Sequence, residues 1–117
     1  MSAFESFAVV RVPFPFTDRQ AQKRRPALVL SKPGFQQACG HLLLAMITSA
    51  RQSSCPLDWP IDDLDHAGLL IPCVVRLKLF TLDERLVLNS LGALSEVDRV
   101  AVIAQLAKLL PHPTELN

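Results

Sequence analysis

The chain has 117 residues, of which 50% are hydrophobic, and its formal net charge is +1. A chain of this length can bury a modest core without a disulfide or a metal, so we expect a single domain over residues 1–117. No apolar run approaches the ~20 residues that span a membrane, and the N-terminal residues lack a signal-peptide pattern, so we predict a cytoplasmic protein.

The charges are distributed unevenly along the chain. Residues 1–59 carry seven basic and three acidic side chains, whereas residues 60–117 carry five basic and eight acidic ones. Such an asymmetry can concentrate positive potential on one surface of a nearly neutral molecule, and a positive surface attracts phosphate groups. The pattern favours a nucleic-acid partner, although an uneven scatter by chance would look the same.

The first predicted elements are two strands joined by a basic loop. Residues 9–12 and 26–30 are aliphatic runs, and residues 17–25 between them are polar. Pro13 and the proline two residues later lack backbone donors, so we expect the chain to leave the first strand there. Arg25 directly precedes a proline, which holds it in an extended conformation at the start of the second strand.

The middle of the chain predicts two more strands. A Lys-Pro-Gly turn leads into residues 35–40, which we expect to be a short connection. Residues 41–48 are nearly all apolar and too few for a typical helix, so they predict a strand buried on both faces, with Thr48 at its polar end. Residues 56–61 predict a short edge strand anchored by a tryptophan.

The last strands precede a C-terminal helix. Residues 68–71, 73–80 and 85–91 are predicted strands, and alternation in the second places Arg76 on a mixed polar face.

The helix is expected to begin at Ser95, which forms a capping-box-like start with Asp98, and to end before Pro111. We expect its apolar stripe to pack on the sheet or across a subunit interface. The stripe consists of Val100, Ile103, Ala104, Ala107 and Leu110.

Two groups of residues could suggest a metal site. The three cysteines show no C-x-x-C spacing, and the acidic stretch Asp62, Asp63, Asp65 and His66 matches neither an EF-hand nor a zinc motif. We therefore interpret the cysteines as reduced structural residues and the acidic stretch as a solvated loop, and we predict no metal and no cofactor.

The stretch PFPFTD, a short polar loop and the stretch RRPALVLS together resemble the N-terminal signature of the MazF/PemK family of toxins from toxin–antitoxin pairs. The similarity continues in order through AMITS, AGLLIPCVVRLKLFTLDE and LGALSEVDRV. Members of that family are typically homodimeric, metal-independent endoribonucleases built on a small SH3-like barrel. The resemblance implies a mainly β fold, with the barrel over about residues 5–92 and a C-terminal helix over about residues 95–110.

The resemblance also assigns site residues. Arg25 and Thr48 match the family's catalytic arginine and threonine. A guanidinium can bind a phosphate with two parallel hydrogen bonds, and a threonine hydroxyl at a strand end can donate to a phosphate oxygen. Because an arginine with a pKa above ~12 is a poor base, we expect Arg25 to stabilise charge, and the general base stays unassigned.

Neighbouring polar residues are expected to hold the RNA backbone and contribute affinity rather than sequence choice. They are Arg19, Lys23, Arg24, Ser49 and Arg51. Phe14, Phe16 and Trp59 are candidates for stacking on bases, although each also suits a core. His41 and His66 are alternative acid–base groups, but His41 lies at the far end of the strand from Thr48.

The chain departs from the family pattern at two positions. Phe7 and Ala8 stand where relatives commonly have Gly-Asp, so the first turn need not have the geometry that it has in the family. Cys73 stands where a serine is frequent.

The implied partners are single-stranded RNA, a cognate antitoxin that covers the basic groove, and a second copy of the chain. Two alternatives remain. One is a CcdB-like gyrase poison built on the same barrel. An aromatic residue at the end of the C-terminal helix would favour that alternative, and this chain has none there. The other is a family member that binds RNA or antitoxin without cutting.

Overall fold

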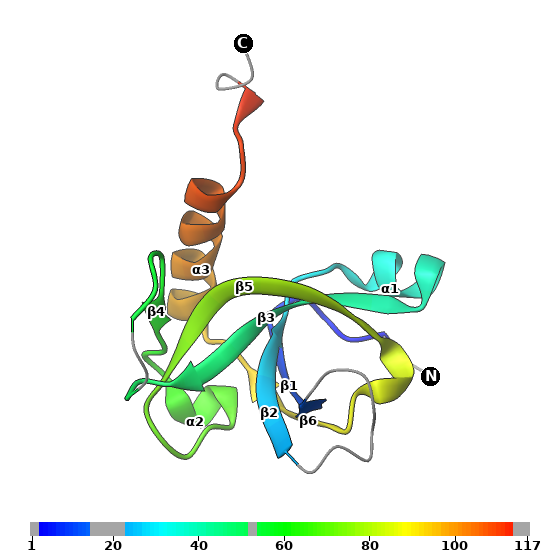
Figure 1. Ribbon diagram of the computed structural model, residues 1–117, viewed down its shortest axis with the longest axis horizontal. Coiled ribbons are helices and arrows are strands. Elements are labelled where there is room, and N and C mark those ends of the chain that lie inside the picture. The colour runs from blue at the N-terminus through cyan, green and yellow to red at the C-terminus, as the bar shows by residue number, and fades with distance from the viewer. Residues whose placement is uncertain (1–2, 15–22, 52–53, 114–117) are drawn as a thin grey trace.

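The computed structural model describes residues 3–14, 23–51 and 54–113, and every structural statement below concerns these residues. Six antiparallel strands form one sheet in the order β4-β5-β3-β2-β1-β6, which curls into a half-barrel with a helix beside it (Figure 1). The strands are β1 (Ala8–Phe14), β2 (Lys23–Val29), β3 (His41–Ser49), β4 (Trp59–Pro60), β5 (Cys73–Asp83) and β6 (Asn89–Ala93). The expected class, a mainly β fold with a small SH3-like barrel and a C-terminal helix, is confirmed.

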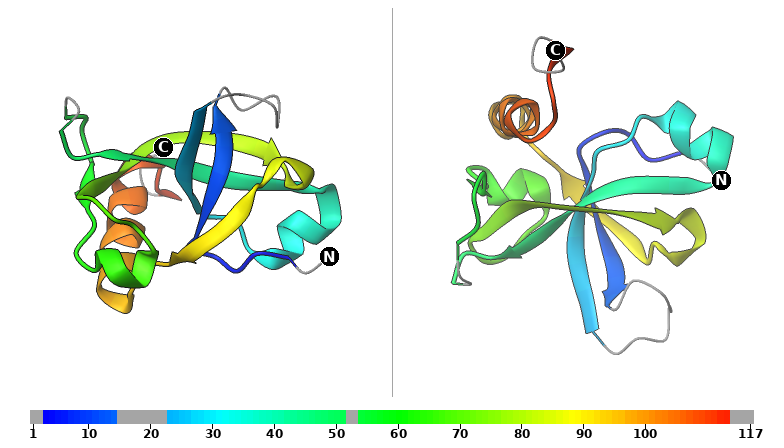
Figure 2. Two further views of the ribbon diagram at one scale, coloured as in Figure 1. Left: turned by 90° about the horizontal axis from the view of Figure 1, so that it is seen from below. Right: turned by 45° about the horizontal axis from the view of Figure 1, so that its top comes forward.

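The helices lie around this sheet. They are α1 (Pro33–Cys39), α2 (Leu64–Ala67), the 3-10 turn η1 (Glu84–Leu86) and α3 (Glu96–Leu109). Figure 2 shows α1 and α3 at opposite sides of the molecule, with the strands between them. None of the helices in the described ranges is long and apolar enough to cross a membrane.

The alternation of the strands produces two buried clusters, because successive side chains point to opposite faces of a sheet. The barrel cluster consists of Val10, Val12, Ala27, Val29, Leu42, Leu44, Leu82 and Val87. The helix-side cluster consists of Val9, Leu28, Ala45, Ile47, Ile61, Ala67, Leu69, Cys73, Val75, Leu94 and Val102. The central strands thus contribute to both clusters, as expected for a strand such as β3 that is buried on both faces.

The first two strands extend further than predicted. β1 continues through Pro13 to Phe14, which pairs with Lys23 at the start of β2. Pairing between β1 and β6 ends at Arg11, whose carbonyl accepts from the Leu88 amide. The backbone N–H and C=O of Arg11 point toward β6, and those of Pro13 point toward the same edge of β1, where β6 no longer pairs with it. The missing N–H of Pro13 therefore costs no hydrogen bond of the ladder with β2. The basic residues that we placed in a loop therefore belong to β2.

Phe7 takes over the backbone conformation that a glycine would favour in the first turn. Its φ is 70°, in the left-handed region, its amide donates to the Val29 carbonyl at 2.6 Å and its carbonyl accepts from the Leu94 amide at 3.0 Å. The ring packs against the helix-side cluster. These contacts offset a conformation that costs a non-glycine residue about 1 kcal/mol or more.

Residues 35–39 are not a connection but most of helix α1, and Gly40 is its C-cap. Pro33 stands in its first turn, where its fixed φ suits a helix, and Gly40 ends it with φ 74°. The buried residue of α1 is Gln36, whose Oε1 accepts from the Phe4 amide and whose Nε2 donates to Glu84. A helix that buries an amide rather than an apolar stripe shows no hydrophobic periodicity, so the sequence pattern missed it.

Residues 68–71 do not form the predicted strand. Gly68 has φ 74° and ends α2, and a Cβ there would collide with the Leu91 carbonyl. Leu69 is buried in the helix-side cluster, but Leu70 is 98% exposed and Ile71 is 56% exposed, so residues 68–71 form a loop at the surface and not part of the sheet. The predicted strand over 85–91 divides into η1 and then β6, which begins at Asn89.

Helix α3 begins as predicted, with the Ser95 hydroxyl accepting from the Asp98 amide at 3.4 Å. It packs on the sheet through the buried Val102 and the half-buried Leu106. All five residues of the predicted apolar stripe are exposed, including Val100 (61%) and Ile103 (52%). The interpretation that this stripe packs on the barrel is wrong, and its role in a subunit interface stays a prediction.

Candidate active site

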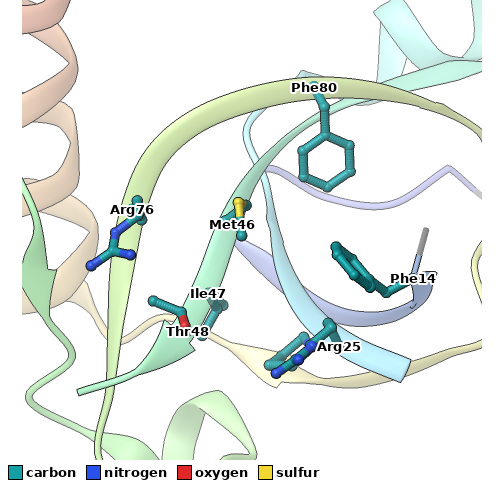
Figure 3. A pocket seen from close by; sticks show the side chains of 8 residues that line it. Phe14, Arg25, Met46, Ile47, Thr48, Arg76 and Phe80 are labelled. Atoms are coloured by element: carbon teal, nitrogen blue, oxygen red, sulfur yellow. The ribbon is translucent and has the colours of Figure 1, made fainter. Parts of the chain in front are cut away.

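The candidate site lies where the barrel cluster opens to solvent. Following the same alternation along β1, β2 and β3, the positions after the last aliphatic residues are Phe14, Arg25, Met46 and Thr48. These four side chains line a hollow of about 210 Å³, the aromatic hollow (Figure 3). Its remaining lining residues are Pro26, Ile47, Arg76 and Phe80. The hollow is therefore a continuation of the core in which polar and aromatic residues replace aliphatic ones.

Strands β2 and β3 bring Arg25 and Thr48 to the same place. The last recorded pair between them is Ala27 with Met46, and the same register continued by two residues puts Arg25 across from Thr48. Beyond that pair the two strands diverge, and Figure 3 shows both side chains at the open end between them. Residues 23 positions apart in sequence thus line one hollow.

A second hollow of about 360 Å³, the loop hollow, adjoins the first. Both are lined by Arg25, Pro26, Ile47 and Thr48, which form a shared wall. The other residues of the loop hollow are Arg11, Arg24, Ser49, Gly68, Leu69, Leu70, Ile71, Cys73 and Leu91. The apolar loop that we expected to be a strand is one side of this second hollow.

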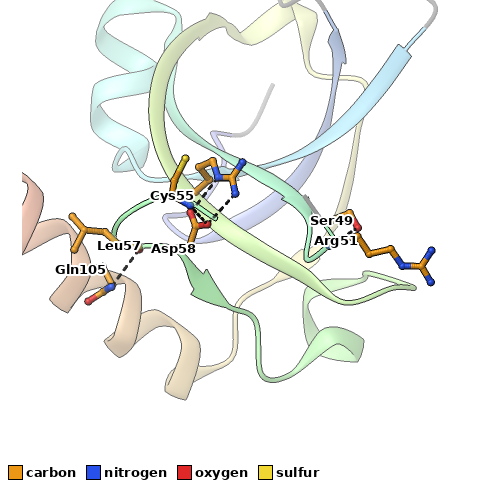
Figure 4. Close-up of polar contacts among 7 residues, drawn as sticks. Ser49, Arg51, Cys55, Leu57, Asp58 and Gln105 are labelled. Atoms are coloured by element: carbon orange, nitrogen blue, oxygen red, sulfur yellow. Dashed lines mark hydrogen bonds and ion pairs between the residues drawn. The ribbon is translucent and has the colours of Figure 1, made fainter. Parts of the chain in front are cut away.

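Only some of the residues predicted to bind the RNA backbone line the two hollows. Arg24 and Ser49 line the loop hollow, whereas Lys23 is exposed at the start of β2 and lines neither. Arg51 is exposed in the turn after β3, where its amide donates to the Ser49 hydroxyl at 3.2 Å (Figure 4). Arg19 lies outside the described residues.

Arg25 presents an exposed guanidinium whose recorded contact is with an aromatic ring. Its Cζ lies 5.6 Å from the centroid of the Phe14 ring, within the range of a cation–π contact. Among the described residues, no carboxylate lies within ion-pair distance of it. The Arg25 side chain thus contacts the Phe14 ring, and no carboxylate of the described residues neutralises its charge, so that charge is available to bind an anion.

Arg76, which strand alternation places on a mixed polar face, is buried and lines the aromatic hollow. Its Nε donates to Asp58 Oδ1 at 3.2 Å and its Nη2 donates to Asp58 Oδ2 at 2.9 Å. The hydrogen bond from Arg76 lowers the pKa of Asp58 against the opposing effect of burial, and Asp58 in turn raises the pKa of Arg76. Both groups are therefore charged, and that edge of Arg76 is occupied by its partner.

The loop before β4 holds Asp58 in position (Figure 4). The Cys55 amide donates to Asp58 Oδ2 at 2.9 Å, Leu57 has φ 69°, and Gln105 of α3 donates to the Leu57 carbonyl at 3.3 Å. Trp59 pairs with Val75, so the same register places Asp58 across from Arg76. A prediction that residues 56–61 pair with residues 73–80 would have placed Asp58 opposite Arg76 and so identified this ion pair.

The alternative acid–base candidates lie outside the two hollows, whereas the stacking candidates are divided between the site and the core. His41 begins β3 and His66 belongs to α2, where its Nδ1 lies 2.6 Å from the Ala93 carbonyl oxygen. The Trp59 indole donates to the buried Asp98 at 2.9 Å, and so it serves the core. Phe14 lines the aromatic hollow, and Phe16 lies outside the described residues.

The lining residues offer cations, the hydroxyls of Thr48 and Ser49, and a buried thiol. Burial raises the pKa of the Cys73 thiol, which therefore stays neutral. Within the described ranges no three His, Cys, Asp or Glu residues are grouped so that they could hold a metal ion. The arrangement suits charge stabilisation on a phosphate by Arg25 and Thr48.

Comparison with known proteins identifies the relatives of this chain. A family model described as "PemK-like, MazF-like toxin of type II toxin-antitoxin system" matches residues 5–110. A comparison with curated proteins gives no significant match.

Several solved structures share the fold. MazE–MazF from Deinococcus radiodurans superposes with a TM-score of 0.71 at 22% identity, over 93% of this chain and 96% of that chain. An endoribonuclease in complex with its cognate antitoxin, from a mycobacterial species, gives 0.73 at 18% identity, over 97% and 100%. The toxin MazF-mt6 of Mycobacterium tuberculosis gives 0.69 at 19% identity, over 86% and 93%. At these identities the likeness establishes the fold.

Proposed function

The chain belongs to the PemK-like, MazF-like toxin family of type II toxin–antitoxin systems, and from this premise we propose that it is a metal-independent endoribonuclease acting on single-stranded mRNA. The observation that carries the proposal is the shared wall of the two hollows, where Arg25 and Thr48 line the same space. A solved structure of similar fold is itself an endoribonuclease.

The chemistry uses the RNA's own nucleophile. The 2′-oxygen attacks the adjacent phosphorus, so that an O2′–P bond forms while the P–O5′ bond breaks, leaving a 2′,3′-cyclic phosphate and a 5′-hydroxyl. The proton lost from the 2′-hydroxyl must be accepted, and the departing 5′-oxygen must gain one. Negative charge develops on the non-bridging oxygens, and Arg25 and the Thr48 hydroxyl donate to them.

None of the residues that line the two hollows in the described part of the chain carries a carboxylate or an imidazole. Arg25 stays protonated at neutral pH and suits the stabiliser and acid roles. We therefore assign charge stabilisation to Arg25 and Thr48, and we assign the role of general base to no side chain.

Single-stranded RNA fits this site better than a duplex does. Unpaired bases can be splayed away from the backbone and enter separate hollows, which paired bases cannot do. Arg11 and Arg24, which line the loop hollow, supply charge for neighbouring phosphates. Lys23, Ser49, Arg51 and Arg19 would extend this backbone contact.

Two protein partners complete the proposal. The first is a cognate antitoxin that covers the basic groove, by analogy with MazE–MazF and with the mycobacterial endoribonuclease in complex with its antitoxin. The second is another copy of the chain, for which the exposed apolar stripe of α3 offers a contact surface. The gyrase-poison alternative gains no support from the comparisons.

The proposed dimer can be tested by the mass of the purified protein in solution. We expect twice the 12.9 kDa of one chain, and we expect Ile103→Glu to give the monomer mass because it puts a charge into the apolar stripe. Lys108→Glu, an exposed change on the same helix outside the stripe, is the control. A parent protein that sediments as a monomer contradicts the dimer.

The proposed activity is tested by incubating the purified protein with a mixed-sequence RNA in EDTA. We expect cleavage products with a 5′-hydroxyl and a 2′,3′-cyclic phosphate, and no cleavage of DNA of the same sequence, which lacks the 2′-hydroxyl. RNA that is bound but left intact would instead support the non-catalytic alternative. If the protein neither binds nor cleaves the RNA, the proposal is contradicted altogether, and a gyrase assay is the next measurement.

A further inference from the structure

We propose that the RNA strand bends around the open edge of β2, and that a phosphate next to the scissile one binds Arg11 and Arg24 on the far side of that edge. This inference rests on the proposed function and adds to it a second phosphate site and the path of the RNA between the two sites.

Neighbouring residues of β2 present their charges to opposite faces of the sheet. Arg25 pairs with Val12, a residue of the barrel cluster, so its side chain lies on the barrel side. Arg24 pairs with Pro13 and, by the alternation of a strand, lies on the opposite face, which also carries Val9 of the helix-side cluster. The two guanidinium groups therefore lie on either side of one strand.

Arg11 completes a pair of cations on this opposite face. It pairs with Pro26, and Arg24 pairs with Pro13, so the two arginines occupy diagonal positions on adjacent strands, about 7–8 Å apart. Both are exposed, and no carboxylate of the described residues lies within ion-pair distance of either. Two guanidinium groups at this spacing can donate to the oxygens of one phosphate.

The edge of β2 between the two sites is open. β2 pairs with β1 along its whole length, but its pairing with β3 begins only at Ala27, so within the described ranges residues 23–26 have no strand partner on that side (Figure 3). The loop hollow spans this edge, because its lining includes the shared wall as well as Arg11 and Arg24. A strand can therefore pass from one site to the other without leaving the hollow.

The substrate itself favours a phosphate as the ligand of the arginine pair. An RNA strand with one phosphate at the shared wall continues on both sides of it, and each further nucleotide brings another negative charge. The cations nearest along the loop hollow are Arg11 and Arg24. A carboxylate of an acidic protein is the other anion that suits them, and the experiments below distinguish it from a phosphate.

The first test measures binding to a single-stranded DNA, which carries the same phosphates but lacks the 2′-hydroxyl and so is not cleaved. Arg11→Ala should weaken binding about tenfold at low salt. It should also make the fall of log affinity with log salt less steep by about 0.7, the value for one phosphate contact of a single strand. Arg11→Lys keeps the charge and should keep the parent's slope.

Arg99→Ala is the matched control, because Arg99 is an exposed arginine of α3 outside both hollows. Its affinity and its salt dependence should equal those of the parent. Since Arg11 is itself exposed, its replacement should leave thermal unfolding near that of the parent, so a weaker affinity reports the lost contact.

The second test locates the phosphate along the strand. In an RNA with one mapped cleavage site, each phosphate beside the scissile one is replaced in turn by an uncharged methylphosphonate. One of these replacements should weaken binding to the parent about tenfold. The same replacement should cause no further loss in the double variant Arg11→Ala, Arg24→Ala, because the cations that contact this phosphate are already absent.

The two tests separate this inference from the proposed function. A less steep salt dependence in Arg11→Ala supports the second phosphate site even if the protein cuts no RNA, in which case only the proposed activity fails. An unchanged affinity and slope overturn the site and leave the arginine pair to an acidic protein. If every methylphosphonate effect persists in the double variant, the path around β2 is overturned.

Discussion

Arg25→Ala is expected to slow single-turnover RNA cleavage by about 10²- to 10³-fold, the usual cost of removing one donor to the charge of a transition state. The guanidinium at the shared wall has no carboxylate partner among the described residues, so its charge is available to the phosphate. Because the phosphate gains charge as the reaction proceeds, the rate constant should fall more than the affinity does.

Two other variants make the result specific. Arg25→Lys keeps the charge but loses the planar fork, so its rate should lie between those of the parent and the alanine variant. Arg99→Ala removes an exposed arginine of α3, outside both hollows, and should leave the rate unchanged. Since Arg25 is itself exposed, its replacement should leave thermal unfolding near that of the parent. An alanine variant that cuts as fast as the parent removes Arg25 from the mechanism.

Asp98→Ala is expected to lower the free energy of unfolding by about 3 kcal/mol or more. Asp98 is fully buried, and its carboxylate accepts from the Trp59 indole (2.9 Å), the amides of Asp62 (2.9 Å) and Asp63 (3.0 Å), and the Ser95 hydroxyl (3.2 Å). Alanine would leave several buried donors without an acceptor, each at a cost of about 1–3 kcal/mol. The measurement is the free energy of unfolding obtained from urea titrations of the parent and the variant.

Glu96→Ala is the matched control for Asp98, because Glu96 is an exposed carboxylate in the same first turn of α3. Its loss removes only the interaction with the helix dipole, about 0.3–1 kcal/mol. Equal destabilisation by the two alanine variants would contradict the role that we give to the buried carboxylate.

The contribution of Asp98 should depend on pH in one direction. Burial raises the pKa of Asp98, but the hydrogen bonds from Trp59, Asp62, Asp63 and Ser95 outweigh it and lower that pKa below its ordinary value. The stabilisation is therefore complete above the unfolded pKa of about 3.9 and is lost as the pH falls through the lower folded pKa. The stability difference between the parent and Asp98→Asn should thus shrink in acid, and a difference that grows there would contradict the assignment.

The sequence predicted the parts of the fold that depend on local pattern. Strand β3 follows from its apolar run, and the start of α3 follows from Ser95 and Asp98. α1 was missed because it buries Gln36, and residues 68–71 were misassigned because an apolar run can also form an exposed loop. Those outcomes depend on tertiary contacts, which a local pattern does not contain.

The candidate site was likewise predictable from the sequence only in part. The resemblance supplied Arg25 and Thr48, and strand alternation accounts for their position at the end of the barrel cluster. The ion pair between Arg76 and Asp58 required the pairing of β4 with β5. The shared wall between the two hollows required the divergence of β2 and β3, which no run of residues encodes.

The central claim is that Arg25 and Thr48 act on the same phosphodiester, and a double-mutant cycle tests it most directly. Single-turnover cleavage would be measured for the parent, Arg25→Ala, Thr48→Val and the double variant, with valine removing the hydroxyl at nearly constant shape. We predict that both single variants are slow and that the double variant is faster than the product of their effects by about tenfold or more, which corresponds to a coupling of about 1.4 kcal/mol. Independent, multiplicative effects, or a Thr48→Val variant as active as the parent, would contradict the claim.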